Sequence, residues 1–298
     1  MSTVLRLGPE RGLNFLVVGD WGRQGKYYQD EVAEQMAEAA RLMNSDFVIS
    51  TGDNFYRNGV QSVSDLLWNR TFENIYHHKS LMKPWYVVLG NHDYRGNPQA
   101  QVNYTDLSSR WYLPKRYYSI TQQVDVSTQA LFVFLDTSPF MKEYHGSFKY
   151  GAVADQDTAA QRRWLDNTLA ESQAEWKVVV GHHQIYSGGF YGNNHDLIAR
   201  IAPILKKHRV HAYFNGHEHD LQHLKGAAPT HYFVSGAGSK LRGTGSSSMT
   251  QFSESVAGFM AVSIISARMR VYCIDYKGNV VYMTVVDKNT TDDLQEDS

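Results

Sequence analysis

The sequence predicts an α/β (α+β) fold in which helices pack against the outer faces of β-sheets. Short β-branched apolar runs, bounded by Gly, Asp or Asn, alternate with amphipathic segments along much of the chain. The last part of the chain, from Thr230, is typical mainly of strands. A length of 298 residues, 42% of them hydrophobic, allows a large core and is close to the upper size for one compact domain.

The individual elements follow from length and periodicity. Six runs resemble buried strands: Asn14–Val18, Phe47–Thr51, Trp85–Leu89, Leu131–Leu135, Lys177–Val180 and Val210–Phe214. Three amphipathic segments predict helices: Tyr28–Met43, Gln156–Ser172 and Leu197–His208. Thr230–Val286 predicts further strands, among them Met269–Asp275. We find no repeat or internal linker, so residues 1–286 are expected to form one domain, and the acidic residues 287–298 a disordered tail.

Composition argues against several classes of function. The 29 basic and 30 acidic residues nearly cancel, which favours neither nucleic acid nor an anionic membrane as a partner. A single cysteine, Cys273, rules out an internal disulfide and a Cys-based zinc cluster. No apolar run is long enough to span a bilayer, and Met1–Gly12 lacks the hydrophobic core of a signal peptide. Oligomeric state and cellular compartment stay open.

Polar loops led by glycine follow five of the predicted strands. They are Gly19-Asp20-Trp21-Gly22, Gly52-Asp53-Asn54-Phe55-Tyr56, Gly90-Asn91-His92-Asp93, Gly181-His182 and Gly216-His217-Glu218-His219. Each loop alone is most often an ordinary turn. Five in order are hard to explain as turns, because the carboxyl ends of strands in an open α/β sheet meet at one ligand-binding edge. Glycine lets the backbone turn sharply and approach a ligand closely.

The donor atoms of these loops suit a pair of metal ions. As candidate ligands we count two carboxylates, one phenol, one amide oxygen and three imidazoles, namely Asp20, Asp53, Tyr56, Asn91, His182, His217 and His219. Seven oxygen and nitrogen donors are too many for one tetrahedral zinc ion. They suit two adjacent ions that share a carboxylate and leave room for water and substrate.

The ordered set of motifs resembles the purple acid phosphatases, within the calcineurin-like metallophosphoesterases. Asp-x-Gly, Gly-Asp-x-x-Tyr, Gly-Asn-His-Asp, Val-x-x-His and Gly-His-x-His all occur here, between Asp20 and His219. The length resembles the small tartrate-resistant members. The resemblance implies a four-layer α-β-β-α sandwich of two mixed sheets flanked by helices. It also implies an acid phosphatase with a binuclear metal centre.

The resemblance assigns a role to each donor. Asp20, Tyr56 and His219 would hold a ferric ion. Asn91, His182 and His217 would hold a divalent ion, which could be zinc, manganese or iron. Asp53 would bridge the two ions. Family members owe their purple colour to charge transfer from the tyrosinate to iron, which here would be Tyr56.

The residues support a ferric ion independently of the resemblance. Many related metallophosphoesterases have Asp-x-His in the first loop and no tyrosine in the second. Here Gly22 stands where that histidine would lie, and Tyr56 follows Asp53 by three residues. The exchange replaces a neutral nitrogen by an anionic oxygen, which stabilises the higher oxidation state of iron. A phenol ionises at a pKa of about 10, but a bound cation favours the ionised form.

The expected reaction is the hydrolysis of phosphate monoesters, either small molecules or phosphorylated peptides. A metal-bound hydroxide would attack phosphorus, and His92 would protonate the leaving alkoxide. Asp93, the next residue, is expected to orient His92 and to keep it charged. His183, next to His182, is expected to pack or to support the ligands.

One departure from the family concerns the substrate side. Small tartrate-resistant members carry a further active-site histidine before a glycine, and the best counterpart here is Tyr191-Gly192. Tyr191 could hydrogen-bond the phosphate instead, or His195 could take that place. The segment 142–155 could cover or regulate the site.

Two other interpretations of function remain. The first is a phosphodiesterase or pyrophosphatase that uses manganese or mixed metals, against which Tyr56 and Gly22 argue. The second is a scaffold protein with a degraded site, against which the complete ligand set argues. The natural substrate cannot be predicted, because the loops that frame such a cleft are its variable part. Family members are commonly secreted, periplasmic or lysosomal.

Overall fold

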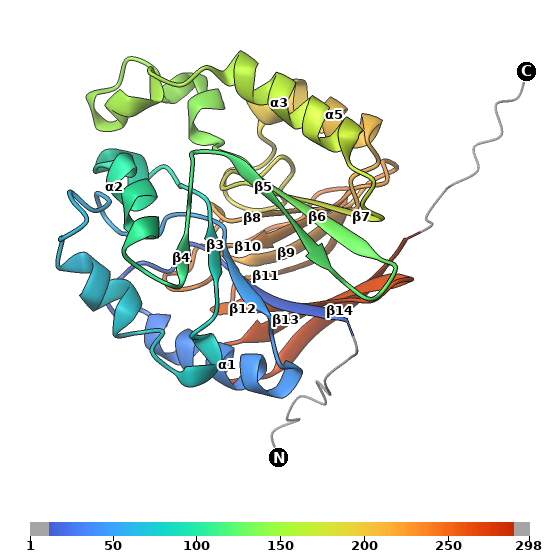
Figure 1. Ribbon diagram of the computed structural model, residues 1–298, viewed down its shortest axis with the longest axis horizontal. Coiled ribbons are helices and arrows are strands. Elements are labelled where there is room, and N and C mark those ends of the chain that lie inside the picture. The colour runs from blue at the N-terminus through green and yellow to red at the C-terminus, as the bar shows by residue number, and fades with distance from the viewer. Residues whose placement is uncertain (1–11, 289–298) are drawn as a thin grey trace, which may run out of the picture.

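A computed structural model describes residues 12–288 of the chain. Two mixed sheets of seven strands face each other, and helices cover the outer side of each sheet (Figure 1). This architecture confirms the predicted sandwich of two sheets flanked by helices. The first two residues of the predicted tail are described, and Asp287 ends a strand rather than beginning a disordered segment. The rest of that prediction, residues 289–298, lies outside the described residues, as does most of Met1–Gly12.

The first sheet has a parallel half and an antiparallel half. In spatial order its strands are β14 (Val280–Asp287), β13 (Arg268–Asp275), β12 (Gly258–Ile264), β1 (Leu13–Val18), β2 (Phe47–Ser50), β3 (Trp85–Val87) and β4 (Trp111–Tyr112). Strands β1 to β4 run parallel, whereas β12, β13 and β14 pair antiparallel. The strand predicted at Met269–Asp275 is confirmed as β13, in which Cys273 is fully buried.

The second sheet is arranged in the same way. In spatial order its strands are β11 (Thr250–Glu254), β9 (Leu221–Lys225), β10 (His231–Ser235), β8 (Ala212–Asn215), β7 (Trp176–Val180), β6 (Gln129–Phe134) and β5 (Tyr118–Gln123). The four central strands β10, β8, β7 and β6 are parallel, and β5, β9 and β11 pair antiparallel. Apart from the edge strand β4, the parallel strands of both sheets are short, largely apolar and mostly buried, as expected for strands covered on each side.

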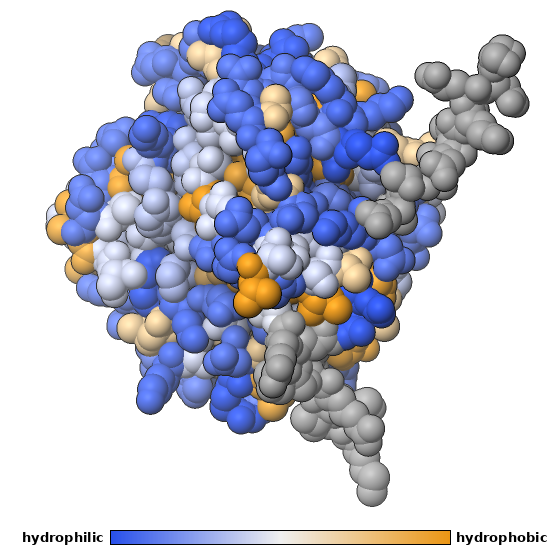
Figure 2. All heavy atoms as spheres, turned by 45° about the vertical axis from the view of Figure 1, so that its right-hand side comes forward, coloured by the Kyte–Doolittle hydropathy of each residue, from blue (hydrophilic) through white to orange (hydrophobic). Residues whose placement is uncertain are grey.

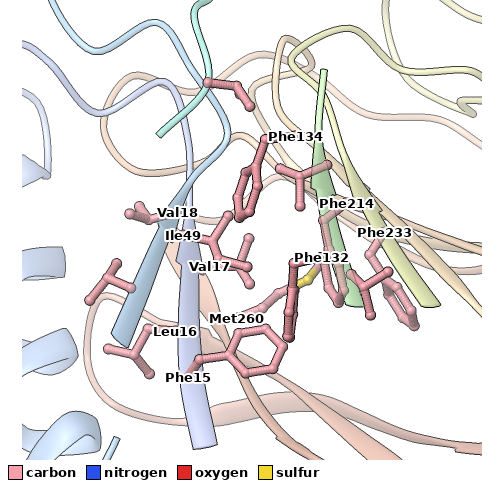
Figure 3. Packing of buried hydrophobic residues seen from close by; sticks show 14 of the residues in the cluster. Phe15, Leu16, Val17, Val18, Ile49, Phe132, Phe134, Phe214, Phe233 and Met260 are labelled. Atoms are coloured by element: carbon pink, nitrogen blue, oxygen red, sulfur yellow. The ribbon is translucent and has the colours of Figure 1, made fainter. Parts of the chain in front are cut away.

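Alternating side chains of β1 show how the layers are held together. Phe15 and Val17 point toward the second sheet, whereas Leu16 and Val18 point the other way (Figure 3). The ring of Phe15 lies 5.3 Å from Phe132 of β6 in an edge arrangement, which aromatic pairs prefer. The core between the sheets is therefore largely aromatic and β-branched, and it fixes where the strands end.

The helices lie outside the sheets. They are α1 (Gln29–Met43), α2 (Pro98–Asn103), α3 (Thr158–Glu171), α4 (His195–Arg200) and α5 (Ala202–Lys207). Short 3-10 helices occupy Lys79–Leu81, Asp93–Arg95, Tyr104–Asp106, Ser138–Phe140, Lys142–Tyr144 and Phe148–Val153, and a π-helix occupies Trp68–Glu73. In Figure 1, α1 lies beside the first sheet, and α3 and α5 lie together on the far side of the second. Lys207 and Asp166 join α5 to α3 at 2.8 Å.

The predicted helix Leu197–His208 is two helices instead of one. The break falls at Ile201, whose backbone angles depart from those of α4, and Pro203 stands in the first turn of α5. Proline lacks the N–H that a continuous helix would need there and favours the start of a new helix. Strands β4 and β5 were not predicted. They are edge strands, and β5 alternates buried and exposed polar residues, so neither has the apolar pattern of a central strand.

Figure 2 shows one face of the surface. Hydrophilic residues dominate that face, and hydrophobic residues form small groups. Within residues 12–288, no helix combines the length and the apolarity needed to cross a bilayer.

Candidate metal centre

The predicted ligands stand directly after five parallel strands. Asp20 follows β1, and Asp53 and Tyr56 follow β2. Asn91 follows β3 in the same sheet, His182 follows β7, and His217 and His219 follow β8 in the second sheet. The centre therefore draws residues from the strand ends of both sheets.

The backbone at three of these residues adopts a conformation that side chains other than glycine rarely take. Asp20, Asp53 and His217 have φ angles of 59°, 53° and 68°. Positive φ outside glycine is uncommon and costs of the order of 1 kcal/mol, so it persists only where the surroundings impose it. Two of the glycines that begin these loops are needed because an aspartate carboxylate lies close to their backbone. A Cβ atom on Gly216 would collide with the carboxylate of Asp20, and one on Gly90 with that of Asp53.

Asp20, Tyr56 and His219 form one compact group of donors. The Tyr56 hydroxyl donates to Asp20 Oδ1 at 2.8 Å and lies 3.2 Å from His219 Nε2. The same nitrogen of His219 is 3.3 Å from Asp20 Oδ1. The structure thus brings together the three side chains to which the family resemblance assigns a ferric ion.

Asn91, His182 and His217 form a second group beside the first. His182 Nε2 lies 3.2 Å from Asn91 Oδ1 and 3.2 Å from His217 Nδ1. Asp53 links the groups, because its Oδ1 is 3.6 Å from His182 Nε2 and donor atoms of Asp20, Asp53 and His182 lie within 4.8 Å of one another. This is the place expected of a bridging carboxylate.

Burial makes the anionic side of this cluster costly without cations. Asp20 is 0% exposed and Asp53 1% exposed, and buried carboxylates need a compensating charge. Burial raises the pKa of Asp53, but the charges of His182 and His92 together with hydrogen bonds from His92 and Tyr56 outweigh it, so the pKa lies below the ordinary value for an aspartate. Burial, Asp20 and Asp53 raise the pKa of the Tyr56 phenol well above its ordinary value.

The donor set fits two cations. The Nδ1 atom of His182 contacts the backbone oxygen of Thr51 at 2.9 Å, which holds the proton on Nδ1 and leaves Nε2 free as a ligand. Mixed carboxylate, imidazole, amide and phenol donors suit zinc, iron or manganese and exclude a purely soft, sulfur-based site. Bound cations would also reverse the preference of Tyr56 for its protonated form.

His183 lies close to His182 and His217, yet its nitrogens are already used. Its Nδ1 is 2.9 Å from the Thr137 hydroxyl, and its Nε2 is 3.0 Å from the Tyr144 hydroxyl. Although donor atoms of the three histidines lie within 4.8 Å of one another, we do not count His183 as a ligand. It packs behind the centre, in accord with the expectation from sequence.

Comparisons with known proteins cover the part of the chain that carries these residues. The calcineurin-like phosphoesterase family model matches residues 13–221. Purple acid phosphatase 4 of Arabidopsis thaliana is 40% identical over 289 residues, which cover 92% of this chain and 83% of that protein. Tartrate-resistant acid phosphatase type 5 of Homo sapiens is 31% identical and covers 93% of this chain and 91% of that protein.

The chain belongs to the purple acid phosphatase family. Among solved structures, "GAP50 the anchor in the inner membrane complex of Plasmodium" resembles it with a TM-score of 0.82 at 24% identity, over 93% of this chain and 89% of that one. At this identity the likeness shows a shared fold alone.

His92, the predicted acid of this purple acid phosphatase chain, lies at the edge of the centre. Its backbone N–H donates to Asp53 Oδ1 at 2.7 Å, and its Nε2 is 4.0 Å from Asp53 Oδ2. Its Nδ1 is 2.7 Å from the backbone oxygen of Arg57. Burial lowers the pKa of His92, and the charge of Asp53 partly opposes this.

Asp93 has other partners than the one predicted from sequence. Its carboxylate accepts hydrogen bonds from the backbone N–H groups of Asn54, Phe55 and Gly90 and from the side chain of Gln101. The partner of the His92 ring is the Arg57 carbonyl instead. The prediction that Asp93 orients the His92 ring is therefore wrong. Adjacent residues of a tight turn point in different directions. Burial and Asp53 raise the pKa of Asp93, and its N–H donors oppose that rise.

Tyr191 and His195, the two predicted substitutes for the family's additional histidine, both line one cavity of about 380 Å³ beside His217. The Tyr191 ring stacks on the His217 ring at 4.5 Å and 20°. His195 is the first residue of α4 and also lines the cavity. The first residues of the segment 142–155 also line this cavity.

Several residues that shape the centre were missed by sequence reasoning. Glu218 is 1% exposed and accepts from the Tyr191 N–H at 2.7 Å, so it holds the loop that carries Tyr191. The Arg242 guanidinium lies 4.7 Å from the centre of the Tyr191 ring. Glu218 stands between two ligand histidines and could have been suspected, but Arg242 lies beside a Gly/Ser-rich loop without a recognisable pattern.

Proposed function

We propose that this protein hydrolyses phosphate monoesters as an acid phosphatase, with a ferric ion and a divalent ion in the centre described above. Asp20, Tyr56 and His219 would hold the ferric ion. The divalent ion would be held by Asn91, His182 and His217, with Asp53 between the two. Purple and tartrate-resistant acid phosphatases at 31–40% identity over most of the chain support the reaction class.

The observation that carries the proposal is the division of the donors into two groups joined by Asp53. The seven donors are more than one ion can bind. A single ion would therefore leave some of these buried donors without a metal. When bound, two such cations would neutralise charge on the phosphoryl oxygens and lower the pKa of a water placed for attack.

The protein's own residues define the rest of the reaction site. The Thr51 carbonyl fixes the tautomer of His182, and Asp53 accepts the backbone N–H of His92 at 2.7 Å. These contacts hold the ligands in place before substrate arrives, which is how such sites lower a barrier. Tyr191 lines the cavity beside His217 and contacts the Arg242 guanidinium, and we propose that it donates a hydrogen bond to a phosphate oxygen.

We propose His92 as the group that protonates the leaving oxygen. Its Nδ1 contacts the Arg57 carbonyl, so that nitrogen carries a proton and Nε2 is the atom available for proton transfer. A positioned acid of this kind contributes about 10²–10⁴-fold to a rate. Because burial lowers the pKa of His92, its charged, donating form would be present mainly in acid, as an acid phosphatase requires.

Tyr56 separates this proposal from a phosphodiesterase or pyrophosphatase with two divalent ions. Its hydroxyl sits 2.8 Å from Asp20 and 3.2 Å from His219, at the place of a ligand rather than in an aromatic core contact. An ionised phenol favours a trivalent ion. The complete donor set argues in the same way against a non-catalytic scaffold.

The deciding experiment compares the purified protein with a Tyr56→Phe variant by elemental analysis, visible spectroscopy and monoesterase assay. We expect iron and a second metal in the native protein, with a visible band that Tyr56→Phe abolishes. Tyr144→Phe is the matched control, because Tyr144 is a buried tyrosine whose hydroxyl contacts His183 rather than a proposed metal ion. It should keep the band.

Three outcomes would contradict the proposal. A colourless native protein without iron would remove the ferric ion. A band that survives in Tyr56→Phe would remove Tyr56 as the chromophore. Diesters or pyrophosphate hydrolysed much faster than monoesters would favour the alternative reactions.

A further inference from the structure

Arg23 places its charge directly on the ring of Tyr56. The guanidinium carbon lies 3.5 Å from the centre of that ring. Such a short distance is possible only if the planar guanidinium lies face to face with the phenol, as arginine commonly does on aromatic rings. Among the cation–ring contacts found in residues 12–288, the others range from 4.3 to 5.5 Å.

The fold fixes Arg23 in this position. Its backbone N–H donates to Gln29 Oε1 at 2.9 Å, and the Gly25 N–H donates to the same oxygen at 2.8 Å. Gln29 is fully buried at the start of α1 and donates through Nε2 to the Thr71 carbonyl at 2.9 Å. The loop that carries Arg23 is therefore tied to α1 and, through Gln29, to the π-helix Trp68–Glu73, so the contact with Tyr56 is built into the fold.

Within the described part of the chain, the positive charge of Arg23 has no carboxylate partner at salt-bridge distance. The Arg23 Nε atom is buried and has no hydrogen-bond partner there. Among the contacts that the structure shows in residues 12–288, the Tyr56 ring is the group closest to the Arg23 guanidinium.

We propose that Arg23 is a positioning residue that tunes the electron donation of the Tyr56 phenolate to the proposed ferric ion. The inference rests on the proposed function, because it assumes that Tyr56 binds iron. It adds a residue outside the seven ligands that sets the colour and the reduction potential of the centre. Sequence reasoning gave Arg23 no role.

The sign of the effect follows from electrostatics. The guanidinium lies on the phenolate ring, so it stabilises the ring's electrons more than it stabilises an electron on the iron beyond the oxygen. Transfer of charge from ring to iron then needs more energy, which moves the band to shorter wavelength. A nearby positive charge also favours the ferrous over the ferric state, so Arg23 raises the reduction potential of the iron.

Two substitutions separate the charge of Arg23 from its flat shape. Arg23→Gln keeps a planar group on the ring and removes the charge, whereas Arg23→Lys keeps the charge and loses the planar stack. We expect the visible band of Arg23→Gln to move to longer wavelength. Its midpoint potential should fall, as measured in a redox titration in which a reductant supplies one electron per iron through mediator dyes. Arg23→Lys should lie closer to the native protein in both measurements.

The controls address folding and overall charge. Iron content and thermal unfolding of each variant show whether the centre is loaded and the protein folded. Lys207→Gln removes one positive charge from an exposed position on α5, and it should leave both the band and the potential unchanged.

Failure of this inference and failure of the proposed function give different results. If the native protein is purple and loaded, but Arg23→Gln keeps the native band and potential, the role of Arg23 is refuted and the ferric centre stands. If Arg23→Lys changes as much as Arg23→Gln, stacking rather than charge is responsible, which also refutes the proposal. A native protein without iron overturns both.

Discussion

His92 is the acid that we propose for the leaving oxygen, and its contacts define which proton it can deliver. Its Nδ1 faces the Arg57 carbonyl at 2.7 Å, so Nε2 is the atom open to the substrate. Its ring also contacts Tyr56, with ring centres 4.4 Å apart. A change at His92 therefore tests both proton delivery and any effect on the neighbouring ligand.

We predict that His92→Ala keeps both metals and loses about 10²–10⁴-fold in rate on alkyl phosphates. Activated aryl phosphates should lose much less, because their leaving group departs without a proton. Measuring kcat/KM on both ester classes, together with metal content, checks this. Similar losses on the two classes would discard the role of His92 as the acid.

The rate of alkyl ester hydrolysis should depend on pH in a definite direction. Burial lowers the pKa of His92, with Asp53 opposing, and the donating form is the protonated one. Hydrolysis of alkyl esters should therefore decline as pH rises through that pKa, and the decline should be absent in His92→Ala. A profile of kcat/KM against pH that is identical in the two proteins would contradict this assignment.

At the scale of elements, Asp93 ties together the loops that follow β2 and β3. The backbone N–H groups of Asn54 and Phe55 come from one loop and that of Gly90 from the other. Gln101 of α2 adds a side-chain donor at 2.9 Å. These loops carry Asp53 and Asn91, so the Asp93 carboxylate holds two proposed ligands at their spacing.

We predict that Asp93→Asn behaves as a structural rather than a catalytic variant. The side-chain amide of this variant would point its NH2 group at the N–H donors that face the Asp93 carboxylate in the native protein. This should cost about 1–3 kcal/mol of unfolding free energy. It should also cost about 10–100-fold in metal affinity. The ratio of rates on alkyl and aryl esters should stay native in the metal-loaded protein. Asp106→Asn, at an exposed position, is the control. A changed rate ratio would return Asp93 to the role first predicted.

The elements also mark the limits of prediction from sequence. Buried parallel strands such as β1 and β7 were predictable, because each is a short run of mostly apolar residues on both faces. Edge strand β5 was not, since its pattern is largely polar and its pairing depends on β6. The contacts of Asp93 could not be predicted either, because they join loops distant in sequence. The family resemblance predicted which donors belong together, but the sequence did not show which backbone groups support them.

At the scale of the whole molecule, the two sheets determine where the centre can form. β1, β2 and β3 of one sheet and β7 and β8 of the other end near each other, and each brings part of the ligand set. The apolar contacts between the sheets, such as Phe15 with Phe132, therefore position the ligands indirectly. Metal binding and the stability of the sandwich should depend on each other.

The second sheet also carries buried histidines whose charge state opposes stability in acid. His223 of β9 and His231 of β10 are 3% and 7% exposed, and their rings share a hydrogen bond of 2.9 Å. Burial lowers the pKa of His223 to about 4 and that of His231 to about 3. The folded protein thus keeps both neutral, whereas the unfolded chain takes up protons below a pH of about 6.5.

We therefore predict that stability falls as pH drops from about 6.5 toward 4, because the unfolded state then binds more protons than the folded state. Each of these histidines should contribute a slope of about 1.4 kcal/mol per pH unit in this range. His231→Gln should reduce that slope by about one histidine's share. Tyr282→Phe removes the hydroxyl that contacts His223 at 2.9 Å without removing an imidazole, so it should lower stability equally at all pH values. Denaturant unfolding of the three proteins between pH 7 and 4.5 checks this, and metal loss in acid cancels in the comparison. Equal slopes in the native protein and His231→Gln would show that the buried pair does not limit stability in acid, where an acid phosphatase must remain folded.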